Sequence, residues 1–137
     1  MGQDKALRQR LTESGVILID RYLRDVEIAY QACDAYLFPV REEDSAMDFP
    51  LSVLEAMACN LPVVAHPYGG LPMALESGEG LVFVEGDEAM LNAIESVKRI
   101  PVATRKKAEP YAWDQVAGRL LATMQGVGDA ETHVRAV

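Results

Sequence analysis

The sequence predicts an α/β domain in which a small parallel sheet is flanked by helices. Two observations favour this fold: short apolar runs alternate along the chain with helix-like segments, and within those runs apolar residues do not alternate with polar ones. Strands of this kind are typical of parallel sheets whose two faces are both covered. At 137 residues, 50% of them apolar, the chain can build one hydrophobic core of ordinary globular type.

The expected strands are short runs rich in β-branched or aromatic residues, each bounded by Gly, Pro or polar residues. They are residues 16–19, 35–38, 62–65 and 80–84. The expected helices show apolar residues at helical spacing or carry start and stop signals. They are residues 3–14, 26–33, 50–60, 87–99 and 113–126. We expect one domain over residues 1–127 and a disordered tail over 128–137.

Three helix boundaries carry recognisable signals. Gly15 stops the first helix, Asp25 is a candidate N-cap for the second, and Asn60 is a candidate C-terminal stop for the third. In the third helix, Leu51, Leu54 and Ala58 share one face, at the spacing of an amphipathic helix.

Composition excludes several classes of function. A net charge of −8 argues against nucleic-acid binding, which needs clustered Lys and Arg. The basic cluster consists of Lys98, Arg99 and residues 105–107; it reads as a solvated face, with a contact to anionic lipid head groups as the weaker alternative. No apolar run is long enough to span a bilayer, and the first ten residues do not form a signal peptide.

The two cysteines, Cys33 and Cys59, lack the spacing of a metal site. Both lie in apolar segments, so we expect buried free thiols in a reducing compartment, with the cytoplasm as the location. No Asp-x-Asp pair follows a strand, so no metal is implied, and we expect no other cofactor.

Ligands of open parallel sheets bind beyond the carboxyl ends of the strands. Three segments occupy such positions here, 20–23, 40–52 and 66–71. In the middle one, Pro50 suits the first position of a helix, and Phe49 before it has no side-chain oxygen to act as a cap. The N–H groups of residues 51–53 are therefore left without an acceptor, which is the arrangement that binds phosphate.

Ser52 and Glu55 are three residues apart and share a face of that helix. Glu55 could bind sugar or ribose hydroxyls through charge-assisted hydrogen bonds. The plainer interpretation is that Asp48 caps the helix and Glu55 is solvated, and periodicity alone favours this plainer interpretation.

Residues 49–70, F-P-L-S-V-L-E-A-M-A-C-N-L-P-V-V-A-H-P-Y-G-G, closely resemble the donor-binding signature of the group 1 retaining glycosyltransferases. The likeness includes Y-Q-A-C-D-A-Y-L-F-P upstream, then G-G-L-P, G-L-V, G-D-E-A-M and Y-A-W-D downstream, and covers roughly residues 16–125. The family has the GT-B architecture of two facing Rossmann-like lobes. The resemblance implies that this chain is an incomplete Rossmann-like lobe, the C-terminal or donor-binding one.

The resemblance also implies roles for individual residues. Glu55 matches the second glutamate of the family's E-x7-E motif, which binds the ribose of the donor. The backbone amides of Leu51 and Ser52, in the run that starts at Phe49 and Pro50, match the pyrophosphate cradle. Residues 18–22, with Tyr22, should lie beside the base. The pair Gly69–Gly70 matches a close turn of the chain past the site, although a turn that needs a positive φ would explain it equally well.

The chain departs from the family pattern at several positions. Met47 stands where the first glutamate of E-x7-E is expected. Glu42, Glu43, Asp44 and Asp48 could each supply a carboxylate from another register, and we prefer Glu43.

These acidic residues crowd the place where a diphosphate should bind. The family supplies an Arg and a Lys from elements without a counterpart here. Only Arg41 is a cation close in sequence, and Arg21 or Arg24 are candidates for a cation close in space. Met73 stands where the family often has a glutamate. His66 and His133 do not match the family's catalytic histidine, which belongs to the other lobe, and a histidine in a turn, such as His66, is usually solvated.

We therefore expect the donor-binding part of a retaining glycosyltransferase, which transfers a sugar from a UDP-, GDP- or ADP-linked donor to an acceptor hydroxyl. No residue is assigned a catalytic role, and the chain would need the missing N-terminal lobe or a partner subunit. The alternative is a degenerate, non-catalytic lobe that acts as a binding or assembly module and self-associates through an exposed sheet edge. A receiver-like domain is disfavoured, because its acidic cluster and Lys are absent.

Overall fold

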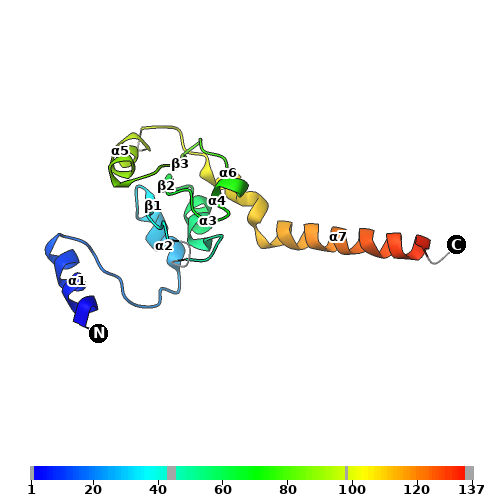
Figure 1. The fold of residues 1–137 in the computed structure, drawn as a ribbon, viewed down its shortest axis with the longest axis horizontal. Helices are drawn as coiled ribbons and strands as arrows, with labels where there is room; N and C mark the ends of the chain where they lie inside the picture. Colours follow the sequence, from blue (N-terminus) through cyan, green and yellow to red (C-terminus); the bar gives the residue numbers. More distant parts are fainter. Residues whose placement is uncertain (1, 43–45, 98, 135–137) are drawn as a thin grey trace.

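A computed structural model of the chain describes residues 2–42, 46–97 and 99–134 (Figure 1). Three short strands and a series of helices make up the described fold. The strands are β1 (Tyr36–Phe38), β2 (Val63–Ala65) and β3 (Leu81–Phe83). The helices are α1 (Gly2–Glu13), α2 (Val26–Gln31), α3 (Leu51–Ala58), α4 (Leu71–Ala74), α5 (Asp87–Val97), α6 (Thr104–Ala108), the 3₁₀ turn η2 (Glu109–Tyr111) and α7 (Trp113–Val134).

The strands form a parallel sheet in the order β1-β2-β3. Tyr36 lies opposite Val63, and Val63 lies opposite Leu81, so consecutive strands stand in register. All three residues of β2 are buried, as expected for a central strand covered on both faces. The prediction of an α/β fold with a small parallel sheet flanked by helices is therefore confirmed.

Two apolar layers enclose the sheet. Val63 and Ala65 of β2 pack with residues of α3 that include Val53 and Met57, on one face. Val64 points to the other face and packs against α5. This division follows from the strand geometry, in which successive side chains point to opposite sides. Since α3 joins β1 to β2, the sheet fixes the direction in which the amino terminus of α3 points.

The expected first strand, residues 16–19, is not a strand. Residues 16–20 have no regular secondary structure, and the four apolar side chains from Val16 to Ile19 are between 41% and 87% exposed. The segment runs with α1 apart from the sheet (Figure 1). An apolar run becomes a strand only when a neighbouring strand accepts its backbone hydrogen bonds, and β2 is the single partner of β1 among the described residues.

The ends of three helices largely follow the sequence signals. Gly15 after α1 has a φ of +78°, and Asn60 after α3 has a φ of 58°, both in the left-handed conformation that ends helices. Asp25 occupies the N-cap position of α2, but its side chain makes no capping hydrogen bond. The capping role expected for Asp25 is therefore wrong.

The segment between α5 and α7 holds a helix, α6, that the sequence did not predict. Thr104 is fully buried and its hydroxyl donates to the Leu61 carbonyl at 2.7 Å. Arg105 Nε donates to the Ala58 carbonyl at 2.8 Å, at the carboxyl end of α3 where a cation is favourable. Lys107 donates to the Glu76 carbonyl at 3.0 Å. Arg99, Arg105 and Lys106 are exposed, as expected for a solvated face, although Arg105 and Lys107 also hold α6 to the domain. Lys98 lies outside the described residues.

The last helix, α7, extends away from the body of the domain (Figure 1). Its start at Trp113 agrees with the predicted helix, but it continues to Val134, so residues 128–134, expected to be disordered, are helical. Residues 135–137 lie outside the described residues.

The cysteine prediction is wrong in part. Cys33 is exposed and Cys59 is half-buried, and both are free thiols. Cys33 follows α2, a helix without a buried residue, so its apolar neighbours in sequence do not form part of a core. Within the described part of the chain, no helix is long and apolar enough to cross a membrane.

Candidate functional site

A hydrogen-bonded group of three side chains joins the loops that follow the strands. Arg41 comes after β1, His66 directly after β2, and Asp87 begins α5 after β3. Arg41 Nε donates to His66 Nε2 at 2.8 Å, and another nitrogen of the same guanidinium contacts the Asp87 carboxylate. His66 is only 3% exposed, which corrects the expectation that this histidine is solvated.

The hydrogen bonds determine which ring nitrogen of His66 carries the proton. An arginine guanidinium is always charged and can only donate, so His66 Nε2 must be an acceptor. Nδ1 then carries the hydrogen and donates to the Val84 carbonyl at 2.7 Å. The neutral imidazole thus bridges the residues that follow β1 and β3, and both of its nitrogens are hydrogen-bonded.

The loop before α3 is held against the glycine pair. Gly70 N–H donates to the Asp48 carbonyl at 2.9 Å. A Cβ placed on Gly69, whose φ is +51°, would lie 2.2 Å from that carbonyl oxygen. Of the two explanations given for the pair, a positive φ applies to Gly69 and not to Gly70. The close approach at Gly69 is made by the chain's own loop.

The amino terminus of α3 leaves backbone donors free. Pro50 is the N-cap residue and Leu51 the first helical residue, one position later than expected, and none of the described side chains caps the helix. The plainer interpretation is therefore wrong about Asp48, which is not the cap, while Glu55 is exposed as that interpretation expected. Val53 N–H donates to the Pro50 carbonyl at 3.2 Å. The N–H groups of Leu51 and Ser52 have no acceptor among the described residues, as helix geometry leads one to expect for a first turn without a cap.

Two tyrosines that the sequence did not single out hold the polar side chains of this turn. Tyr30 of α2 donates its phenol hydrogen to Glu55 Oε2 at 3.0 Å. Tyr36 of β1 donates to Ser52 Oγ at 2.9 Å. The two rings meet edge to face, with centroids 5.7 Å apart. Burial and the hydrogen bond to Glu55 raise the pKa of Tyr30 well above its usual range, so its hydroxyl remains a donor.

The structure brings together the predicted site residues at the start of α3, from Phe49 to Glu55. Phe49 packs on Tyr111, with ring centroids 5.4 Å apart. Tyr22 is 89% exposed in the segment before α2, so it does not pack against these residues. Glu43 and Asp44 lie outside the described residues, and Met47 is 67% exposed.

An apolar groove lies beside the same turn. It has a volume of about 610 Å³ and runs between α3 on one side and α6, η2 and the start of α7 on the other. Its lining includes Leu51, Leu54 and Ala58, so the apolar face expected for this helix is the outward one. The core side of α3 is made by Val53, Ala56 and Met57 instead.

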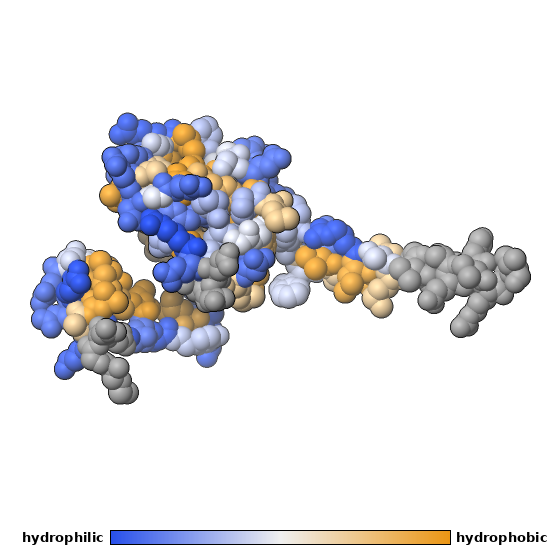
Figure 2. Space-filling model, viewed as in Figure 1, coloured by the Kyte–Doolittle hydropathy of each residue, from blue (hydrophilic) through white to orange (hydrophobic). Residues whose placement is uncertain are grey.

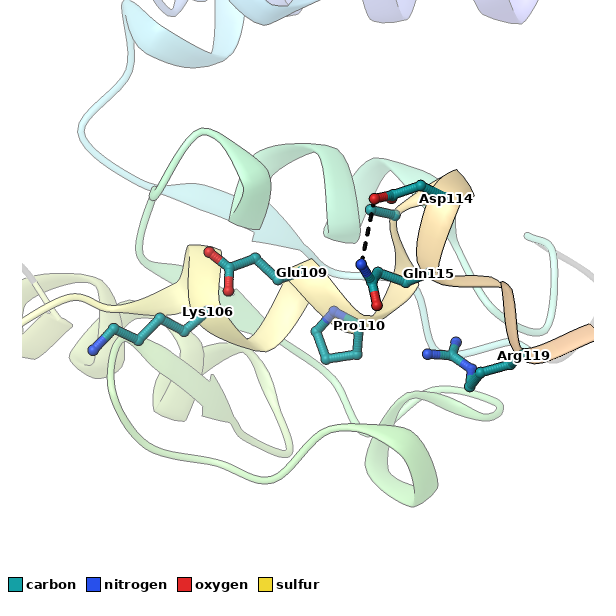
Figure 3. Close-up of a pocket in the computed structure, with 7 residues that line it drawn as sticks. Lys106, Glu109, Pro110, Asp114, Gln115 and Arg119 are labelled. Atoms are coloured by element: carbon teal, nitrogen blue, oxygen red, sulfur yellow. Dashed lines mark hydrogen bonds between the residues drawn. The ribbon is translucent and has the colours of Figure 1, made fainter. Parts of the chain in front are cut away.

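A second hollow, of about 490 Å³, lies at the junction of α6 and α7 and is polar. Its charged lining residues carry both signs and do not converge, since Lys106 points away from Arg119 (Figure 3). Asp114 accepts from Gln115 at 3.3 Å. Within the described residues, no group of three or more His, Cys, Asp or Glu side chains is placed to hold a metal ion.

Comparison with protein families finds a match over residues 1–99 to the family described as glycosyl transferases group 1. The D-inositol 3-phosphate glycosyltransferase of Corynebacterium urealyticum is 31% identical over 149 residues, which cover 94% of this chain and 34% of that protein. The enzyme of the same description from Geodermatophilus obscurus is 30% identical, over 86% of this chain and 28% of that protein. The chain thus spans about a third of the length of these relatives.

Among solved structures, a sucrose-phosphate synthase from Thermosynechococcus elongatus superposes with a TM-score of 0.66. The match covers 94% of this chain and 35% of that one at 20% sequence identity. It supports the fold, in which the sheet and its flanking helices correspond to part of a larger protein.

Proposed function

Because the chain belongs to the group 1 glycosyltransferase family, we propose that it forms the donor-binding part of a retaining glycosyltransferase. The reaction would move a sugar from a nucleotide-sugar donor to an acceptor hydroxyl. One observation carries the proposal: the uncapped amino terminus of α3 presents the N–H groups of Leu51 and Ser52 next to two polar side chains of its first turns. Donors and acceptors for a nucleoside diphosphate are thus grouped on one helix.

The chemistry of α3 suits the two ends of such a ligand. The helix dipole and the two free N–H groups favour a diphosphate at Leu51 and Ser52. Glu55 lies one turn further along, where its carboxylate can accept from ribose hydroxyls. The same N–H groups would stabilise the charge that develops on the leaving diphosphate, which is electrostatic catalysis by donors held in place before the reaction.

Negative charge near the site works against diphosphate binding. Glu42 and Asp48 are both exposed in the loop that precedes α3. The cation near the carboxyl ends of the strands, Arg41, already contacts Asp87. We therefore propose that another part of the complete enzyme, in a longer chain or in a partner subunit, supplies further positive charge. We also propose that this enzyme is cytoplasmic.

The free face of α7 supports a need for that partner. Its apolar residues recur at helical spacing and are largely exposed, as the orange stripe at the start of the helix shows (Figure 2). They include Trp113 at 87% exposed, Leu120 at 60%, Leu121 at 58% and Met124 at 62%. An isolated helix of this kind gains most of its stability from packing, so we propose that the missing lobe covers this face.

A second candidate function is a degenerate lobe that binds partners without catalysis. Met47, at the position where the family's first E-x7-E glutamate is expected, favours it, because a thioether cannot replace a carboxylate at the donor sugar. The edge of β1, which pairs with no further strand among the described residues, and the α7 stripe would then support self-association. Sedimentation of the purified chain together with nucleotide titration distinguishes the two, since the assembly module predicts oligomers that bind no nucleotide.

The test is calorimetric titration of the chain with UDP, GDP and ADP. We expect one of them to bind with millimolar or tighter affinity. Glu55→Ala should weaken that binding by about 1–3 kcal/mol, the loss typical of a hydrogen bond to a charged group. Glu76→Ala, which removes another exposed carboxylate after α4, is the matched control for net charge and should bind like the unaltered chain. A folded chain that binds none of the three contradicts the proposal.

A further inference from the structure

We propose that Tyr30 and Tyr36 are positioning residues of the α3 site with opposite tasks. Tyr30 holds Glu55 as a hydrogen-bond acceptor, and Tyr36 turns the hydroxyl of Ser52 into a hydrogen-bond donor toward the ligand. The inference rests on the proposed binding of a nucleoside diphosphate at this turn. It adds that Tyr30 positions a group that binds the ribose, whereas Tyr36 positions a group that binds the phosphates.

Tyr30 restricts a side chain that would otherwise be mobile. Glu55 is exposed on α3, and a free glutamate there would occupy several rotamers. The phenol of Tyr30 donates to Oε2 at 3.0 Å, which leaves Oε1 and the remaining lone pair of Oε2 to accept from a ligand. The ligand groups that match are hydroxyls, and two adjacent hydroxyls match best.

Tyr36 acts on Ser52 in the opposite sense. A serine hydroxyl has one hydrogen to donate and two lone pairs that accept. A phenol is more acidic than an alcohol and is the better donor, so Tyr36 donates to Ser52 Oγ across their 2.9 Å contact and the serine hydrogen is not used in that bond. It can join the free N–H groups of Leu51 and Ser52 in donating to one acceptor. A phosphate group, which offers only acceptor oxygens at its charged end, fits this set.

The rings of the two tyrosines pack against each other, so Tyr→Phe variants can test the hydroxyl groups without disturbing the ring contacts. Their rings are 5.7 Å apart at an interplanar angle of 71°, and both pack against the core under α3. Tyr→Phe removes the hydroxyl and keeps these ring contacts. Tyr111→Phe is the matched control, because the Tyr111 hydroxyl donates to the Ala74 carbonyl at 2.9 Å, whereas Glu55 and Ser52 are bonded to Tyr30 and Tyr36.

The experiment compares two ligands on each variant of the 137-residue chain. The first is whichever nucleoside diphosphate binds by calorimetry, and the second is inorganic pyrophosphate, followed by amide shifts in NMR spectra. Tyr30→Phe should weaken the nucleotide about three- to tenfold, the loss expected from releasing one glutamate side chain, and leave pyrophosphate unchanged. Tyr36→Phe should weaken both ligands, and Tyr111→Phe neither.

A double variant shows whether Tyr30 acts through Glu55. In a Glu55→Ala background, Tyr30→Phe should have no further effect on nucleotide affinity. If Glu55→Ala weakens binding but Tyr30→Phe does not, or if Tyr30→Phe weakens pyrophosphate equally, the inference is overturned and the proposed function stands. If the folded chain binds no nucleotide, the proposed function fails and the inference fails with it.

Discussion

Replacing Gly69 by alanine tests how the loop before α3 is held in place. A Cβ at Gly69 would lie 2.2 Å from the Asp48 carbonyl oxygen and 2.8 Å from its side-chain oxygen. Carbon and oxygen atoms that approach most closely without bonding stand about 3.3 Å apart, so the loop must retreat by about 1 Å. The hydrogen bond from Gly70 N–H to the Asp48 carbonyl, now 2.9 Å long, would then break.

Two costs contribute to the expected loss of stability in Gly69→Ala. Alanine in a left-handed conformation costs about 1–2 kcal/mol. The lost hydrogen bond adds about 0.5–1.5 kcal/mol. We therefore expect the free energy of unfolding, measured with urea, to fall by about 1.5–3.5 kcal/mol. Hydrogen exchange at the Gly70 amide, followed by NMR, should lose its protection.

Gly86→Ala separates the two costs. Gly86 has a φ of +88°, which strains alanine at least as much as the +51° of Gly69, but a Cβ there meets no atom within 4 Å. Gly86→Ala should thus cost only the conformational part and leave the Gly70 amide protected. The reasoning is refuted if Gly69→Ala destabilises the chain no more than Gly86→Ala while Gly70 retains its slow exchange.

Two further predictions concern buried polar groups. Thr104→Val keeps the shape of the side chain but leaves the Leu61 carbonyl, now bonded at 2.7 Å, without its donor. The free energy of unfolding in urea should therefore fall by about 1–3 kcal/mol. An unchanged free energy of unfolding would show that water replaces the hydroxyl. The raised pKa of Tyr30 means that the folded state holds this proton more tightly than the unfolded state, so stability should be lost as the pH rises above about 10. Tyr30→Phe should lose less stability than the unaltered chain over that range, and equal losses in parallel urea titrations would contradict the assignment.

The elements predicted correctly are those whose signals are local. Residues 62–65 and 80–84 are apolar runs between turn residues, and the strands β2 and β3 lie inside them. Residues 16–19 carry the same signal but lack a neighbouring strand, which no local pattern reveals. The helix α6 is polar and short, and the contacts of Thr104 and Arg105 with residues more than forty positions earlier hold it in place.

In the candidate site, too, the features predicted correctly are local in sequence, and those that were missed depend on contacts between distant residues. Helical spacing was enough to place Ser52 and Glu55 on one face near an uncapped terminus. It could not show that Tyr30 and Tyr36 contact them, since those bonds span 25 and 16 positions along the chain. His66 was misjudged for the same reason, because its burial depends on the Val84 carbonyl and on Arg41, and neither is its neighbour in sequence.

The connection made by His66 has a consequence for engineering within this family. Loops at the carboxyl ends of strands are natural places to exchange segments between relatives when a new specificity is sought. Here Arg41, His66 and Asp87 follow three different strands but form one hydrogen-bonded unit. A graft that brings in only the loop after β1 would leave a buried imidazole nitrogen without its donor, so chimaeras of this lobe should exchange the segments after all three strands together.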